Sequence, residues 1–282
     1  VLVFSTYATY IVMSFMMLVM IYMLLPQAQV SAERINEVLD RRASVREGSV
    51  TAGKETGSVE FRSVSFRYPH ASEDALSDIS FRVERGETLA IIGATGCGKT
   101  TLVSLIPRFY DATAGEVLVD GVNVRDYAFD ALYDKLGYVT QKAVLFSGSL
   151  RENVFFGESA ASDNEDDFRT AVEVSQAKEY VDKLPEGAEH RVAQLGRNLS
   201  GGQKQRLSIA RALARKPEIL IFDDSFSALD YRTDAMLRAG LNERLAGTTK
   251  IIVAQRISTI RHADRIIVLD RGAAVGIGTH DE

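Results

Sequence analysis

Residues 88–101 read TLAIIGATGCGKTT, and this stretch decides the fold class of the chain. Residues 88–93 form a continuous apolar run of the kind that makes a buried parallel strand. From Gly93 to Thr100 the sequence fits G-x-x-x-x-G-K-[ST], a glycine-rich turn that joins a strand to a helix and folds its backbone N–H groups around phosphates. In such a loop Lys99 reaches the phosphates and the Thr100 hydroxyl binds Mg²⁺. The alternative is a glycine-rich turn with an incidental lysine, which would not require a strand before it and a helix after it.

The chain beyond residue 58 alternates strands with helices. Polar and apolar residues alternate at 59–68 and 78–84, which predicts half-buried antiparallel strands. Apolar runs predict buried strands at 219–222, 250–254 and 265–270, and helical spacing predicts helices near 99–109, 164–183, 203–215 and 230–245. This order predicts an α/β domain with a mostly parallel sheet. The run at 219–222 ends in Asp223, a carboxylate that in a phosphate-loop fold holds the water shell of Mg²⁺.

Composition excludes several classes of protein. The 282 residues are 46% hydrophobic, and the formal net charge is -5. No nucleic acid is expected as a partner, because binding to phosphodiester backbones would require a basic surface. Cys97 is the only cysteine, so an intrachain disulfide framework and a structural zinc site are excluded. This usage fits a reducing compartment.

The N-terminal segment predicts a membrane-spanning helix. No charged residue occurs from Val1 to Ala32, and the apolar run exceeds the roughly 20 residues that a helix needs to cross a bilayer core. The alternatives are a buried helix of a soluble domain and a signal peptide, but the basic residues Arg34, Arg41 and Arg42 follow the run instead of preceding it. The positive-inside rule places the residues after this run in the cytosol. The chain begins at Val and ends abruptly, so we expect a fragment of a longer protein.

The apolar run also carries a methionine face. Met13, Met16, Met17, Met20 and Met23 cover an arc of about 120° on a helix, one continuous face. Methionine adapts to varied hydrophobic ligands. Lipid contact or helix packing would explain the same face.

The stretch 198–206, NLSGGQKQR, resembles the LSGGQ signature of the ATP-binding cassette (ABC) family. Ser200, Gly201, Gly202 and Gln203 stand ahead of a predicted helix, where they form a second anion-binding N-terminus. The resemblance implies that they contact the γ-phosphate of ATP bound to a partner cassette, so that two cassettes enclose two ATP molecules head to tail. A plain helix cap is the alternative.

Other markers of the family follow in order. Tyr68 resembles the aromatic residue that stacks on adenine, although a lone strand tyrosine is more often structural. Gln141 resembles the Q-loop glutamine, which senses Mg²⁺ and links the ATP site to the membrane domain, and Asp230 ends a stretch that resembles the D-loop. The resemblance implies that ATP and Mg²⁺ are bound by Tyr68, Gly93, Thr95, Gly96, Cys97, Gly98, Lys99, Thr100, Thr101, Asp223 and Asp230, with Thr100, Gln141 and Asp223 at the metal.

Two positions depart from the family pattern. Asp224 stands where catalytic sites have a glutamate that polarises the attacking water, and Gln255 stands where the family has its switch histidine. One methylene less moves a carboxylate by roughly 1.5 Å, and the geometry of a general base is strict. Glutamine donates a hydrogen bond but cannot exchange a proton at this position. The pattern resembles the degenerate-site subunit of heterodimeric multidrug exporters. A homodimer that tolerates both residues, and a non-hydrolysing regulatory subunit, remain alternatives.

The resemblance implies an exporter-type half-transporter built on a P-loop NTPase cassette. The expected cassette has a mostly parallel sheet core, an antiparallel β subdomain and a helical subdomain, preceded by one transmembrane helix. Expected boundaries are 1–42 for the last membrane helix with its extension, 43–57 for a linker and 58–282 for a C-terminally truncated cassette. The full-length protein is expected to be a multi-pass protein of the plasma or inner membrane with its cassette in the cytoplasm. Its expected partners are a second half-transporter, lipid and an unidentified hydrophobic substrate. A soluble ABC ATPase of chromosome maintenance or DNA repair is disfavoured, since the chain has no room for a long coiled coil between Gln141 and Ser200.

Overall fold

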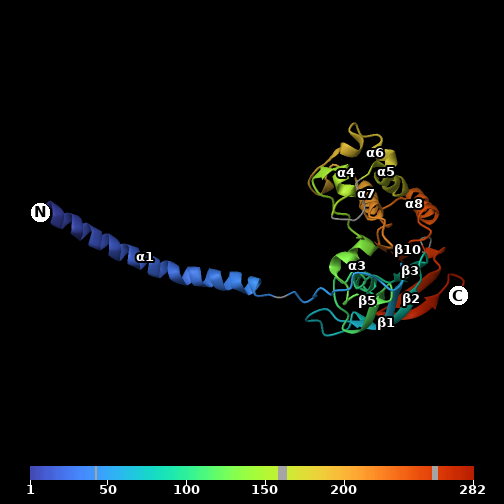
Figure 1. The fold of residues 1–282 in the computed structure, drawn as a ribbon, viewed down its shortest axis with the longest axis horizontal. Coiled ribbons are helices and arrows are strands. Elements are labelled where there is room, and N and C mark those ends of the chain that lie inside the picture. The colour runs from blue at the N-terminus through green and yellow to red at the C-terminus, as the bar shows by residue number, and fades with distance from the viewer. Residues whose placement is uncertain (42, 158–163, 256–259) are drawn as a thin grey trace. The chain divides into compact units, whose positions relative to one another are not determined.

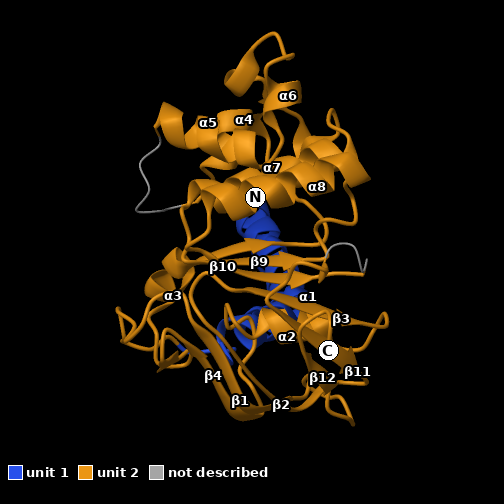
Figure 2. Cartoon of the chain, turned by 90° about the vertical axis from the view of Figure 1, so that its right-hand side faces the viewer, with its two compact units in different colours: residues 1–46 blue, residues 47–282 orange. Residues whose placement is uncertain are grey.

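The computed structural model describes residues 1–41, 43–157, 164–255 and 260–282, so Arg42 lies outside the described residues. The chain divides into two compact units, Val1–Arg46 and Glu47–Glu282 (Figure 2). The second unit is called the cassette below.

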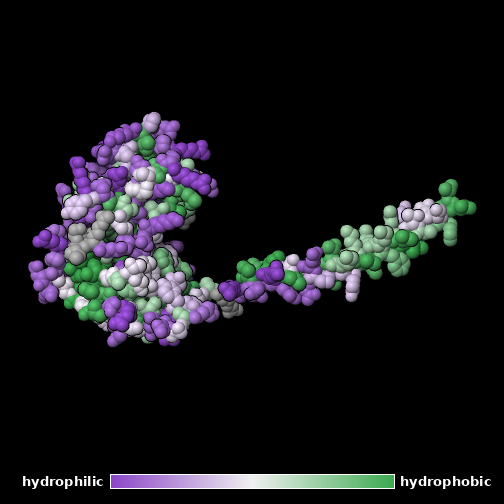
Figure 3. All heavy atoms as spheres, turned by 180° about the vertical axis from the view of Figure 1, so that it is seen from behind, coloured by the Kyte–Doolittle hydropathy of each residue, from purple (hydrophilic) through white to green (hydrophobic). Residues whose placement is uncertain are grey.

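The first unit consists mainly of one helix, α1 (Leu2–Leu39). Its 38 residues correspond to about 57 Å of helix. None of these residues is buried, and the most apolar stretch has a mean hydropathy of 2.2. Apolar side chains dominate from the N-terminus and give way to polar ones towards the C-terminal end of the helix (Figure 3). The helix is therefore long and apolar enough to cross a bilayer.

The cassette contains an antiparallel sheet in the order β2-β1-β4-β5. Its strands are β1 (Val59–Phe66), β2 (Leu76–Val83), β4 (Ala114–Val119) and β5 (Val122–Asn123). The alternating patterns at 59–68 and 78–84 correctly predicted β1 and β2. Phe61 and Phe81 lie opposite each other on these strands and stack with ring centroids 4.6 Å apart.

A six-stranded sheet forms the centre of the cassette (Figure 1). Its order is β12 (Ala273–Gly278), β11 (Arg265–Asp270), β3 (Thr88–Gly93), β10 (Thr249–Val253), β9 (Ile219–Asp223) and β6 (Leu136–Val139). All neighbours are parallel except β12, which confirms the mostly parallel core. Both faces are buried: Ile219 and Ile221 belong to one hydrophobic core, and Leu220 and Phe222 to the other. A strand buried on both faces reads as a continuous apolar run, which is why β3, β9, β10 and β11 were predicted, whereas β6 and the mostly exposed β12 were not.

Most of the helices gather at one end of the cassette, and the antiparallel strands lie at the other (Figure 2). The helical part contains α4 (Leu150–Val154), α5 (Glu165–Val174), α6 (Lys178–Val181), α7 (Gly201–Ala214), two short 3₁₀ turns (Gly187–Glu189 and Gln194–Gly196) and the strand pair β7 (Gly148–Ser149) and β8 (Arg191–Val192). The remaining helices are α2 (Lys99–Ser104), α3 (Phe129–Lys135) and α8 (Tyr231–Arg244). The expected antiparallel and helical subdomains are thus both present.

Two predicted helices are shorter than their patterns indicated. The helix expected at 99–109 ends at Ser104, ahead of Pro107, which has no N–H to continue the ladder. The helix expected at 164–183 is interrupted at Gln176, whose φ of 60° is left-handed. The Gln176 carbonyl accepts a hydrogen bond from Arg206 of α7 at 2.8 Å, so a tertiary contact accompanies the break.

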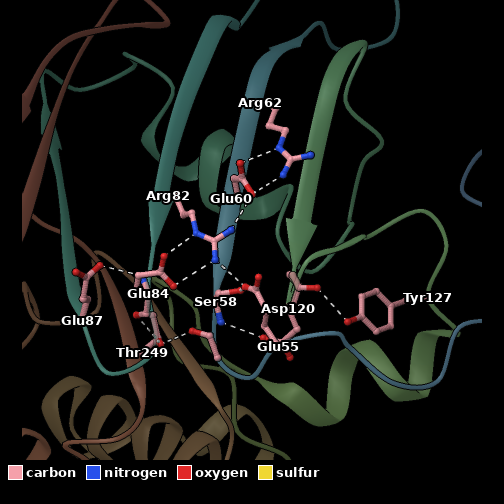
Figure 4. A network of polar contacts seen from close by, with 12 residues as sticks. Glu55, Ser58, Glu60, Arg62, Arg82, Glu84, Glu87, Asp120, Tyr127 and Thr249 are labelled. Atoms are coloured by element: carbon pink, nitrogen blue, oxygen red, sulfur yellow. Dashed lines mark hydrogen bonds and ion pairs between the residues drawn. The ribbon is translucent and has the colours of Figure 1, made fainter.

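Residues 47–57, here called the strap, run past the ends of the antiparallel strands and are hydrogen-bonded to the turns that follow β4 and β5 (Figure 4). Val50 N–H donates to Asp126 O at 2.8 Å, and Lys54 N–H donates to Asp120 O at 2.8 Å. Glu55 forms an ion pair with Arg82 at 2.7 Å. The second part of the expected linker is therefore hydrogen-bonded to the cassette along its length.

Candidate nucleotide site

The loop after β3 has the conformation that its glycines permit. Gly93 and Gly98 have φ values of 151° and 103°, and a Cβ on Gly93 would lie 2.2 Å from Leu269 O. Lys99 is buried, and its Nζ donates to Gly93 O and Ala94 O, both at 2.8 Å. The loop carbonyls thereby hold the ammonium group across the glycine-rich turn.

Thr100 and Asp223 place a hydroxyl and a carboxylate side by side. Thr100 Oγ1 donates to Asp223 Oδ1 at 2.8 Å, and the Tyr138 hydroxyl lies 3.4 Å from Asp223 Oδ2. Burial raises the pKa of Asp223. Hard oxygen donors of this kind suit Mg²⁺. The described residues contain no group of three or more His, Cys, Asp or Glu that could hold a metal ion.

Two glutamine side chains that are distant in sequence from Asp224 meet at its carboxylate. Gln141 Nε2 donates to Asp224 Oδ2 at 2.9 Å, and Gln255 Nε2 donates to the same oxygen at 2.7 Å. The three residues follow the carboxyl ends of β6, β9 and β10, which are neighbours in the sheet. Parallel strands bring the residues after them to one edge, where ligands bind in open α/β sheets. Asp224 itself is 7% exposed, and its φ is 49°.

The Tyr68 ring stands at another side of the site. Its hydroxyl lies 2.9 Å from Thr101 Oγ1, and its ring makes edge-on contacts with Phe66 and Tyr110 at 4.8 and 5.3 Å. The side chain is held by these contacts and remains 36% exposed. A fixed, partly exposed aromatic ring is suited to stacking on a planar base.

These groups surround one pocket of about 510 Å³. The predicted residues that line it are Tyr68, Thr95, Gly96, Gly98, Lys99, Thr100, Thr101, Gln141, Asp224 and Gln255. Gly93, Cys97 and Asp223 lie behind this lining, in the loop and at the end of β9. Sequence reasoning missed Glu73, Asp74, Ala75, Val253, Arg271 and Gly272, which also line the pocket. No motif marks most of these residues, which come mainly from the loops before β2 and after β11 and reach the pocket only through the tertiary fold.

The signature and D-loop residues do not line this pocket. Ser200 is the N-cap of α7, where its Oγ accepts from Gln203 N–H at 3.3 Å and its own N–H donates to Gln203 Oε1 at 2.8 Å. Gly201 is exposed, and nothing lies within 4 Å of a Cβ placed on it. Asp230 is the N-cap of α8 and accepts from Thr233 N–H at 2.9 Å. In this single chain, Ser200 and Asp230 therefore each cap their own helix.

A phosphate loop after a parallel strand, beside a carboxylate at the end of another parallel strand of the same sheet, defines a P-loop nucleotide-binding protein. Residues 76–227 match the family model described as ABC transporter. The chain belongs to the ABC transporter family, and its cassette is that of an ABC transporter ATPase.

Similar proteins include several of exporter type. The chain is 44% identical over 282 residues to an uncharacterized ABC transporter ATP-binding protein of Mycobacterium tuberculosis, covering 99% of this chain and 48% of the relative. It is 45% identical over 219 residues to a putative multidrug export ATP-binding/permease protein of Bacillus subtilis, covering 78% and 37%. It is 41% identical over 251 residues to an ATP-dependent lipid A-core flippase of Pseudomonas aeruginosa, covering 89% and 42%.

A solved structure supports the same class. The structure of a bacterial Atm1-family ABC exporter with ATP bound superposes with a TM-score of 0.83 at 33% identity, covering 93% of this chain and 46% of that one. The chain therefore spans about half the length of the relatives that it matches.

Proposed function

We propose that this chain is the ATP-binding half of a heterodimeric ABC exporter and that its own ATP site hydrolyses ATP slowly. The observation that carries this proposal is the environment of Asp224, where the side-chain amides of Gln141 and Gln255 both donate to one carboxylate oxygen. A general base must present a free oxygen to the water that it polarises. Both amides engage Oδ2 and hold the short carboxylate towards themselves, so that only Oδ1 is left to meet a water.

Binding of ATP at this site is supported by a complete set of residues. Lys99 neutralises phosphate charge, and the glycine-rich loop supplies backbone N–H donors. Tyr68 offers a ring for adenine. Thr100 and Asp223 would hold Mg²⁺, which when bound would supply positive charge at the phosphates. A site that binds ATP and turns it over slowly needs all of these residues and lacks only an efficient base.

Gln255 contributes to the slow turnover. A glutamine amide donates a hydrogen bond, but it does not take up and release a proton as a histidine does at neutral pH. In this chain its amide is also 2.7 Å from Asp224 instead of free in the pocket. Asp224 and Gln255, the two residues that depart from the family pattern, are therefore hydrogen-bonded to each other.

The signature would serve the second site of the assembly. Ser200 and the exposed Gly201 begin α7, where N–H groups and the positive end of the helix dipole favour an anion. Their distance from the lining of this chain's own pocket is consistent with a phosphate supplied by a partner cassette.

Transport of a hydrophobic compound is the proposed outcome. The named relatives include a putative multidrug exporter and a lipid A-core flippase, and α1 supplies an exposed apolar helix in a chain half as long as they are. A homodimeric exporter of lipid, peptide or drug, with Asp224 and Gln255 at both ATP sites, is the second candidate. A non-hydrolysing regulatory subunit is the third.

Turnover of the Asp224→Asn variant separates these candidates. In a heterodimer with one efficient site, phosphate release by the assembled transporter in saturating MgATP should change by less than about 3-fold, because the base that matters, worth roughly 10²- to 10⁴-fold, is on the partner. In a homodimer the same change should reduce turnover to background. The double change Asp224→Glu with Gln255→His should add activity at a slow site.

ATPase assays of this chain with and without its partner identify a regulatory subunit, which releases no phosphate alone.

A further inference from the structure

The hydroxyl group of Tyr68 is bonded to the helix that follows the phosphate loop. It lies 2.9 Å from Thr101 Oγ1, and both side chains line the nucleotide pocket. Thr101 is the third residue of α2, follows Thr100 directly and is only 8% exposed. Stacking on a planar base uses the ring of a tyrosine and not its hydroxyl. The Tyr68 hydroxyl therefore makes a contact that stacking alone does not require.

Two aromatic neighbours fix the direction in which this hydroxyl points. The rings of Phe66 and Tyr110 lie 4.8 and 5.3 Å from the Tyr68 ring, with interplanar angles of 80° and 83°. Edge-to-face pairs of this kind are a favoured arrangement of aromatic rings. A rotation that took the Tyr68 hydroxyl away from Thr101 would disrupt both pairs. The hydrogen bond to Thr101 is therefore supported by the packing around it.

The direction of this hydrogen bond depends on what occupies the pocket. Either hydroxyl can be the donor in the bond between Tyr68 and Thr101. Each hydroxyl has one hydrogen to donate and can accept at the same time. An ionised phosphate oxygen can only accept, so a threonine that contacts one must donate to it. The oxygen of Thr101 is then left to accept from Tyr68.

We propose that the Tyr68 hydroxyl is a positioning group for the triphosphate: it donates to Thr101, and Thr101 donates to a phosphate oxygen of bound ATP. Hydrogen bonds in such a chain polarise one another, so Thr101 becomes a stronger donor when it accepts from Tyr68. The residue whose ring is available for adenine thus also contributes to phosphate binding. The inference rests on the proposed binding of ATP in this pocket.

Inorganic tripolyphosphate separates the two roles of Tyr68, because it carries the phosphates of ATP without the base. The affinities of the full chain for tripolyphosphate with Mg²⁺, for adenosine and for MgATP are measured by titration calorimetry. Tyr68→Phe keeps the ring and removes the hydroxyl. It should weaken the binding of tripolyphosphate by about 3- to 10-fold, the usual effect of losing one hydrogen bond. The affinity for adenosine should not change.

Tyr110→Phe is the matched control, because Tyr110 packs against the same ring and its hydroxyl makes no hydrogen bond to any residue that the structure describes. It should change none of the three affinities. Thr101→Val removes the other hydroxyl and should weaken tripolyphosphate binding at least as much as Tyr68→Phe. Adding Tyr68→Phe to Thr101→Val should have no further effect, since members of one network do not act additively. Thr101→Ser, which keeps the hydroxyl, should bind as wild type does.

Unchanged tripolyphosphate affinity in Tyr68→Phe, an equal loss in Tyr110→Phe, or a further loss on adding Tyr68→Phe to Thr101→Val would overturn this role of the hydroxyl. If Tyr68→Phe does not fold, Tyr68→Leu serves the same test, because tripolyphosphate has no base to stack. Failure of the proposed ATP site gives a different result. In that case wild type binds no tripolyphosphate, or Lys99→Ala binds it as tightly as wild type does.

Discussion

Two consecutive carboxylates at the end of β9 have different surroundings. Asp223 faces two hydroxyl groups, whereas Asp224 receives two amides. Burial raises the pKa of Asp223, and the hydrogen bond from Thr100 only partly opposes this effect. The nearby charge of Lys99 also opposes the effect, but desolvation by burial remains the larger cause, and a charge that is not fully compensated for burial costs free energy. Asp223 is therefore expected to reduce the stability of the nucleotide-free protein, and the proposed role in metal binding would explain its presence.

The first prediction concerns Asp223→Asn. The pKa of Asp223 is raised above the ordinary 3.8, so its contribution to stability is present at low pH and is lost as the pH rises through the raised value. In EDTA and without nucleotide, the variant should be more stable than wild type at pH 7, by about 1 kcal/mol or 2–4 °C in Tm. The advantage should shrink towards pH 4.

Thermal unfolding of the full chain at both pH values measures this difference. Asp78→Asn is the control, because Asp78 is exposed and has a φ of 47°, a conformation that asparagine also tolerates. Its Tm should match wild type. A lower Tm for Asp223→Asn at pH 7 would contradict the assignment of a buried, costly charge.

Among the elements, the strap shows how a polar segment becomes ordered. Gly48 and Gly53 allow the backbone to approach the sheet closely: a Cβ on Gly48 would lie 2.2 Å from Asp126 O, and one on Gly53 would lie 2.4 Å from Asp120 Cβ. Asp120 is fully buried and accepts from Ser58 N–H at 2.9 Å. Lys135 of α3 lies 2.6 Å from the same carboxylate. The strap thus ends beside the buried carboxylate of Asp120, which forms an ion pair with Lys135 of α3.

The second prediction is that Gly53→Ala destabilises the cassette. The new methyl group cannot fit against Asp120, so the strap must shift and the buried contacts of Asp120 weaken. We expect a loss of about 1–3 kcal/mol, as for other overpacked sites. Chemical denaturation of the full chain measures it.

Gly276→Ala serves as the comparison. A Cβ on Gly276 would lie 3.9 Å from the Val268 side chain, an ordinary contact, so stability should stay within about 0.5 kcal/mol of wild type. Equal stability of the two alanine variants would show that the strap is not closely packed.

In the whole molecule, the pocket that contains the phosphate loop is not lined by the signature residues of the same chain. The third prediction is that Ser200→Ala lowers phosphate release by the assembled transporter by about 10²-fold, the usual effect of losing one positioned donor at a reacting phosphate or oxyanion. The same change also removes a helix cap, which costs about 1 kcal/mol of stability.

Ser149→Ala separates the two effects. Ser149 caps α4 with the same reciprocal arrangement, in this case with Glu152, and it lies outside the signature. Both variants should lose similar stability, but only Ser200→Ala should lose turnover. Equal ATPase activity of the two variants would contradict a role for the signature in trans.

Local sequence patterns were enough to predict the fold class and most of the residues that line the pocket. Strand Thr88–Gly93, the glycine-rich loop and the strand ending at Asp223 are local patterns, because burial on both faces and phosphate binding each require particular residues in a short stretch. The long apolar helix α1 could be predicted for the same reason, because a run of apolar residues is visible in the sequence without knowledge of tertiary contacts.

Only the tertiary structure decided which of these residues meet. Gln141, Asp224 and Gln255 are far apart in the chain, and they converge because β6, β9 and β10 are adjacent, an order that no local pattern records. The break at Gln176, the ordering of the strap and the bond between Tyr68 and Thr101 likewise depend on contacts between distant segments. Local sequence fixes what a segment can form, whereas the neighbours of that segment are set by the packing of the whole chain.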